Sequence, residues 1–208
     1  MNPMRERAKE HFPTVLLTLL SIVQALALEL LWSFLHENEF LFQSNRDAYL
    51  TWIQIGATFS GLMLVWVVYA SNVMRFRWIP ATSDLIIPFL IGIIEFMLID
   101  TLGPDTVGYW FILMACIFGL MNWVAHTTMR SARREADNEE FFRNVEPAQL
   151  KDLLQPLSTV VSLLLVGVFL LAYPDNLIFA FVTLLGINGL LIWQFYIGAQ
   201  FWSDSLKE

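Results

Sequence analysis

Six long apolar runs constrain the fold of this chain more than any other feature. Each run is close to the roughly 20 residues that a helix needs to cross the hydrocarbon of a bilayer. None shows the residue-by-residue alternation of a membrane β-strand. The sequence therefore predicts an all-α integral membrane protein with six transmembrane helices in one domain, residues 1–208. The predicted spans are residues 12–35, 49–72, 82–102, 107–129, 156–173 and 177–201.

The composition agrees with a membrane protein. The chain is 57% hydrophobic and only 15% charged, whereas soluble domains carry about 25% charged residues. The net charge of −7 is opposite to the basic excess of nucleic-acid-binding proteins, so the bilayer is an expected partner and nucleic acid is not. The first apolar run is too long for the core of a cleavable signal peptide, and we interpret it as a retained helix.

The positive charges of the loops predict the orientation. Eleven of the twelve Lys and Arg residues fall on the side that would hold both termini, and only Arg46 falls on the other side. Because cytoplasmic loops carry the excess of Lys and Arg, we expect both termini in the cytoplasm and the protein in an inner or plasma membrane. The polar segment 131–155 would lie on the same side, and its apolar residues recur at spacings typical of short amphipathic helices.

A short pattern recurs in the three descending spans. It reads Gly-Leu followed closely by Trp, at 61–66, 119–123 and 189–193, and each ascending span begins near a proline. The recurrence suggests three tandem helical hairpins, and true repeats would form a bundle with pseudo-threefold symmetry. Gly, Leu and Trp are common in membrane helices, so chance similarity is the alternative.

Two carboxylates lie inside the apolar runs. A charge at membrane depth costs roughly 3 kcal/mol or more, so Glu29 and Glu95 are candidate functional residues. Counting 1.5 Å per residue from the centre of each span places them at nearly the same level. Glu29 continues a stripe of small or polar residues, and Gln54 of the second span is the predicted hydrogen-bond partner of Glu29. The stripe consists of Thr18, Ser21, Ala25 and Glu29.

These groups lead to two hypotheses about function. The first is a channel or transporter that passes protons or small cations along intramembrane polar side chains. Its path candidates are Glu29, Glu95, Gln24, Gln54, Asn122, Asn188 and Gln194. The second is a non-catalytic structural, assembly or sensor subunit of a membrane complex, with partner-docking candidates Phe141, Phe142 and Leu150. In that case the carboxylates hold helices together. For either function we expect a homo-oligomer or a subunit of a larger complex.

The sequence carries none of the common signatures of an enzyme. It lacks a Cys-x-x-Cys pair, a glycine-rich phosphate loop, Gly-x-Ser-x-Gly and His-Glu-x-x-His. The three histidines are not spaced as metal or haem ligands. We therefore expect no cofactor, no metal site and no enzymatic activity.

Overall fold

Helices form the whole framework of the protein. The computed structural model describes residues 3–143, 145–147 and 149–205, and within these ranges all regular elements are helical. The long helices are α1 (Pro3–Glu37), α2 (Arg46–Arg75), α3 (Thr82–Asp100), α4 (Val107–Ala132), α6 (Leu150–Ala172) and α7 (Leu177–Ser205). The connections contain η1 (Glu39–Phe42), η2 (Pro104–Thr106), η3 (Ala136–Asn138) and the single-turn α5 (Glu139–Phe142).

The predicted fold class is confirmed. Six of the described helices are long and apolar enough to cross a membrane, and each corresponds to one predicted span. Large apolar side chains such as Phe89, Leu165 and Val182 are more than half exposed. Apolar patches of this extent on a soluble protein would be a liability, whereas in a bilayer they contact lipid. The chain is therefore a polytopic, membrane-embedded protein.

The helices extend beyond the apolar runs because backbone hydrogen bonds continue into polar flanks. The largest differences are at the starts of α1, which begins at Pro3 rather than at residue 12, and of α6, which begins at Leu150 rather than at residue 156. Residues 150–155, which the sequence assigned to the polar connector, form the first turns of α6. The Asp152 carboxylate accepts a hydrogen bond from the Gln149 backbone N–H at 2.8 Å. This contact satisfies an amide at the start of the helix.

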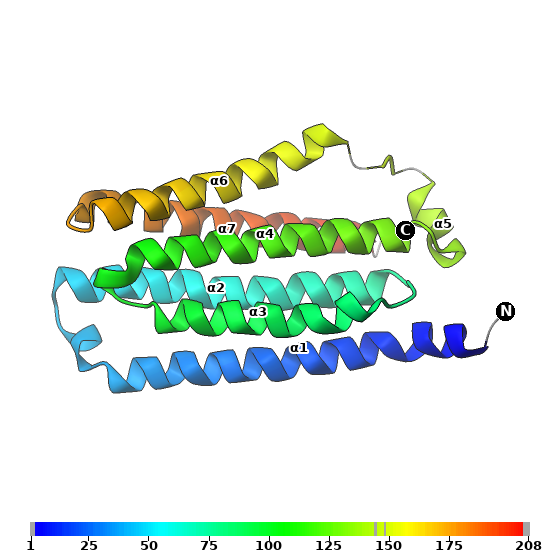
Figure 1. Ribbon diagram of the computed structural model, residues 1–208, viewed down its shortest axis with the longest axis horizontal. Coiled ribbons are helices and arrows are strands. Elements are labelled where there is room, and N and C mark those ends of the chain that lie inside the picture. The colour runs from blue at the N-terminus through cyan, green and yellow to red at the C-terminus, as the bar shows by residue number, and fades with distance from the viewer. Residues whose placement is uncertain (1–2, 144, 148, 206–208) are drawn as a thin grey trace.

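The long helices lie side by side, with both termini at the same end of the bundle (Figure 1). We call this end the termini end and the other the far end. α1 forms one edge and packs on α2 and α3, whereas α6 forms the opposite edge and packs on α4. α7 packs on α2. A buried hydrogen bond from Trp110 Nε1 to Thr58 Oγ1, 3.0 Å long, joins the first turn of α4 to α2.

The three antiparallel helix pairs are not arranged with threefold symmetry. In such a bundle α2 would contact α3 as extensively as α4 contacts α6, and α7 would pack on α1. Instead α2 barely touches α3, and α7 packs on α2. The pseudo-threefold bundle that true repeats would form is thus absent, although the chain does fold as consecutive helical hairpins.

The last hairpin opens toward the termini end. α6 and α7 contact each other near the turn that joins them, where the Phe169 and Phe179 rings lie 4.6 Å apart between centroids. From there α6 follows α4 and α7 follows α2, so the two helices diverge (Figure 1). The divergence leaves room between four helices in the half of the bundle nearest the termini.

Candidate functional site

A carboxyl–amide pair joins α1 to α3. Gln24 Nε2 donates to both Glu95 oxygens, at 2.7 and 3.0 Å. Glu95 is 1% exposed and Gln24 is 6% exposed. The two helices approach closely here because residue 92 is glycine: a Cβ atom at Gly92 would lie 2.6 Å from Val23 Cγ1. Both residues are path candidates, but no feature of the sequence indicates that they form a pair.

Glu29 does not lie at the level of Glu95. Because Gln24 contacts Glu95, Glu29 lies five residues, or about 7.5 Å, closer to the far end. It is level with the last residues of α3, near Asp100. Its side chain is exposed, as are Thr18, Ser21 and Ala25, so the predicted stripe lies on the outer surface of the bundle, where Ser21 Oγ accepts a 3.4 Å hydrogen bond from Trp66 Nε1 of α2. The equal depth that we predicted is wrong, because the helix centres are offset and span lengths alone do not reveal the offset.

Gln54 is buried but does not pair with Glu29. Its Oε1 accepts a hydrogen bond from the Gly103 backbone N–H at 3.1 Å, which fastens α2 to the turn after α3. Its Nε2 has no hydrogen-bond partner among the described residues. The predicted Glu29–Gln54 hydrogen bond is therefore not formed.

Asn188 also connects two helices. Its Nδ2 donates to the carbonyl oxygens of Ile53, at 3.2 Å, and Leu184, at 2.8 Å. The first of these bonds ties α7 to α2, and the second returns to the preceding turn of α7. The donor that the sequence analysis placed in a path is thus directed at backbone carbonyls.

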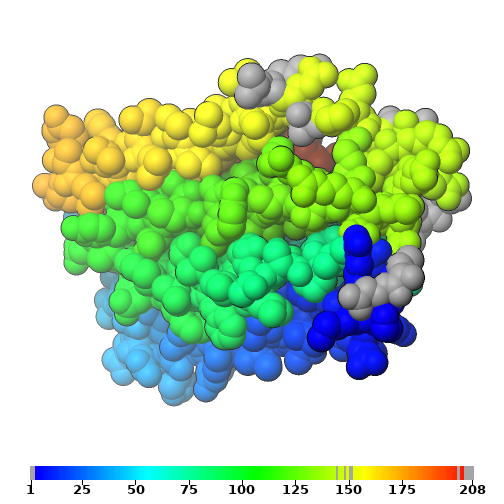
Figure 2. Space-filling view, turned by 45° about the vertical axis from the view of Figure 1, so that its right-hand side comes forward, coloured from blue at the N-terminus to red at the C-terminus, as the bar shows by residue number. Residues whose placement is uncertain are grey.

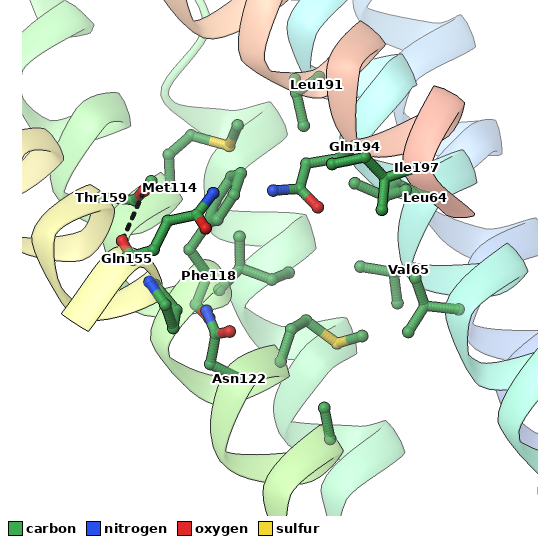
Figure 3. A pocket seen from close by; sticks show the side chains of 16 residues that line it. Leu64, Val65, Met114, Phe118, Asn122, Gln155, Thr159, Leu191, Gln194 and Ile197 are labelled. Atoms are coloured by element: carbon green, nitrogen blue, oxygen red, sulfur yellow. Dashed lines mark hydrogen bonds between the residues drawn. The ribbon is translucent and has the colours of Figure 1, made fainter. Parts of the chain in front are cut away.

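A cavity of about 390 Å³ lies where α6 and α7 diverge. α2, α4, α6 and α7 all line it, mostly with leucine, valine, isoleucine, methionine and phenylalanine (Figure 3). Its polar side chains are Asn122, Gln155, Thr159 and Gln194. Two of these, Asn122 and Gln194, were path candidates. Gln155 and Thr159 were not among the predicted site residues. Their i, i+4 spacing places them on one face of a helix, but only if that helix begins before residue 156.

The carboxamides of this cavity differ in how they are satisfied. Asn122 Nδ2 donates to the Phe118 carbonyl oxygen, 2.7 Å away on its own helix. The Gln155 and Gln194 carboxamides form no hydrogen bond with any residue that the structure describes. In Figure 3 both turn toward the interior of the cavity. Gln155 is exposed at the rim, and Gln194 is partly buried.

The cavity is uncharged and opens at the termini end. None of the described residues that line it is Asp, Glu, Lys, Arg or His. In Figure 2, α7 is visible in dark red through an opening between the last part of α4 and the chain that leads into α6. The cavity shares no lining residue with the Gln24–Glu95 pair. The seven path candidates therefore do not line one continuous route.

The termini end is closed over α1 and α3 by a polar cluster. Lys9 lies 2.6 Å from Glu135 and 3.2 Å from Asp137, and Arg5 lies 3.3 Å from Glu135. The hydrogen bond from Lys9, assisted by Arg5, holds the pKa of the Glu135 carboxyl below its usual value. Nearby, Asn138 Nδ2 donates to the carbonyls of Arg77 and Ala132.

The partner-docking candidates that the structure describes are engaged within the chain. The rings of Phe141 and Phe142 lie 5.0 and 5.6 Å from the Phe76 ring, and both residues are half-buried. The Leu150 side chain lies outside the described part of the structure. Among the described residues, no group of three His, Cys, Asp or Glu side chains could hold a metal ion.

The site therefore consists of two separate parts, a closed carboxyl–amide pair and an open cavity with carboxamides. No protein-family model, no curated protein and no solved structure matches the chain. Its membrane class rests on its own six apolar helices, and its function has to be inferred from the chemistry of these two parts.

Proposed function

We propose that this is a membrane transport protein whose solute binds in the cavity between α2, α4, α6 and α7. The observation that carries the proposal is the cavity itself. Its volume of about 390 Å³ falls within the roughly 300–1,000 Å³ of small-ligand sites, which combine apolar walls with a few convergent polar groups. A bound solute would give the Gln155 and Gln194 carboxamides the partners that they lack within the chain.

This proposal replaces a single path through both carboxylates. Glu29 is exposed on the single chain, so it lies outside the cavity route proposed here. Glu95 remains the candidate for a proton that moves with the solute, because it is a buried carboxyl group whose only hydrogen-bond partner in the described structure is an amide. An amide can donate to an ionised carboxylate and accept from a protonated one. In this proposal Glu95 is the group that would carry a proton across the membrane.

A transport protein must expose its solute site to each side of the membrane in turn, and this can be tested without knowing the solute. Single cysteines would be placed at Asn122 and Gln194, with Cys116, which is exposed, replaced by Ser. Sealed vesicles of both orientations would then be treated with a charged, membrane-impermeant maleimide. A cysteine at Gln200, an exposed residue near the end of α7, is the matched control.

We expect the cavity cysteines to be labelled from both sides and the Gln200 cysteine from the termini side only. Labelling of the cavity cysteines from one side only would contradict transport. That result would favour the alternative, a sensor or assembly subunit with a fixed pocket. The same vesicles show which side carries the termini, which the loop charges predict to be the cytoplasm.

A further inference from the structure

The walls of the cavity restrict the chemical class of its ligand. Apolar side chains from α2 and α4, including Leu64, Val65, Met114 and Phe118, form most of the surface. A ligand with hydroxyl groups all around it would leave many of them facing these walls without hydrogen bonds, at a cost of roughly 1–3 kcal/mol each. Most of the ligand surface must therefore be apolar.

The residues that line the cavity also restrict the charge of its ligand. No described lining residue is charged, and the buried carboxyl group of Glu95 lies outside the cavity, paired with Gln24. An ion in apolar surroundings without a counter-charge loses its hydration and gains no compensating attraction. Two carboxamides without partners, by contrast, offer both N–H donors and carbonyl acceptors. Such groups suit a neutral head that can donate and accept hydrogen bonds.

We propose that the cavity binds an uncharged amphiphile, with its polar head at Gln155 and Gln194 and its apolar part along α2 and α4. This inference rests on the proposed role of the cavity as the solute site. The outer faces of both α6 and α7 carry exposed apolar side chains, such as Leu157 and Trp193, so both helices that flank the cavity lie against lipid. The amphiphile can arrive from the adjacent leaflet of the bilayer or from water at the termini end.

The binding test uses three probes with the same chain and different head charges. The full-length protein in phosphatidylcholine nanodiscs would be titrated with radiolabelled 1-dodecanol, dodecanoate or dodecyltrimethylammonium, and binding to empty nanodiscs would be subtracted. We expect saturable binding of the alcohol and at least tenfold weaker binding of both ions. The Gln155→Leu/Gln194→Leu variant should bind the alcohol at least tenfold more weakly, whereas Gln200→Leu should bind it like the unaltered protein.

The outcomes separate the ligand class from the proposed function. If an ion binds as tightly as the alcohol and the double variant loses it, the cavity is the solute site and the uncharged class is wrong. If the double variant, with its thermal stability intact, binds the alcohol normally, the ligand lies elsewhere and the inference is overturned. In that case, two-sided labelling of the cavity cysteines would still support transport.

A second experiment identifies the side from which the ligand enters the cavity. The Gln194→Cys variant would be treated with a maleimide attached to a phospholipid and, separately, with a charged water-soluble maleimide. Labelling by the lipid reagent supports entry from the bilayer, and labelling by the soluble reagent supports entry from water at the termini end. Labelling by neither would show that the cavity is closed to any ligand of this size and would overturn the inference.

Discussion

The two edges of the bundle differ in whether the polar side chains inside the membrane have hydrogen-bond partners within the chain. At the α1/α3 edge, the Gln24 amide and the Glu95 carboxyl are buried and bonded to each other. At the α6/α7 side, the side-chain carboxamides of Gln155 and Gln194 form no hydrogen bond with a described residue, although the Gln155 backbone carbonyl accepts from Ser158 and Thr159. A paired polar group in a membrane holds helices together, whereas an unpaired one is costly unless something else occupies the site. We infer that the pair at the first edge holds α1 and α3 together, whether or not Glu95 also carries a proton, and that the second edge binds the ligand.

Helix packing explains the difference. A third or more of the apolar window is buried in α1, α2, α3 and α4, against 17% in α6 and 22% in α7. α6 is attached to α4 near the far end, where a Cβ at Gly167 would lie 2.8 Å from the Gly108 carbonyl oxygen. The hairpin is thus fastened at one end and free to diverge at the other.

Gln24→Leu should give the largest loss of stability, because it leaves the buried Glu95 carboxyl without a hydrogen-bond partner. We expect a loss of about 3 kcal/mol, at the upper end for a buried group that can ionise, measured by thermal unfolding in detergent. Glu95→Gln retains a partner for Gln24 and is the matched control with a small effect. The Gln24→Leu/Glu95→Leu variant should lose less than the sum of its single variants. Additive losses would show that the pair contributes nothing as a pair.

Gly167→Ala should give the next largest loss of stability, because Gly167 lies where α6 packs closely against α4. The new methyl group would meet the Gly108 carbonyl oxygen at 2.8 Å and Ile112 Cγ1 at 2.7 Å, and overpacking of this kind costs about 2 kcal/mol. Gly186→Ala is the control, since nothing lies within 4 Å of its Cβ position. It should be neutral or slightly stabilising, by up to roughly 1 kcal/mol. Equal effects at the two positions would contradict the close helix approach.

Acid should weaken the polar cluster that closes the α1/α3 edge. Glu135 has a lower pKa in the folded protein than in the unfolded chain. Its stabilising contribution is therefore complete above the unfolded value, about 4.3, and is lost as the pH falls through the folded value. We expect the Tm of the protein to fall more steeply below about pH 5 than that of Glu135→Gln, by less than the effect of Gly167→Ala. Parallel pH profiles would show that Lys9 and Arg5 do not stabilise the folded state.

The sequence was sufficient to predict the six helices but not which helices pack against each other. Apolar runs reflect the thickness of the bilayer, and so the six spans were predicted to within a few residues, apart from the early starts of α1 at Pro3 and of α6 at Leu150. The packing partners of each helix depend on side-chain contacts such as that of Gly92 with Val23. A single apolar run does not reveal such contacts. This is why Gln24 and Glu95 were each singled out without being paired. It is also why Glu29 was assigned to an interior that it does not face.

Gln194→Leu should have the smallest effect on stability, although it is the same substitution as Gln24→Leu at another carboxamide in the membrane. Gln194 has no hydrogen-bond partner among the described residues, so its removal leaves no buried group orphaned. We expect a change within about 0.5 kcal/mol, or a gain, because leucine suits the apolar walls around it. Thermal unfolding of the two variants side by side measures the contrast. A loss as large as that of Gln24→Leu would mean that Gln194 holds helices together, and the open side of the bundle would then have no separate role.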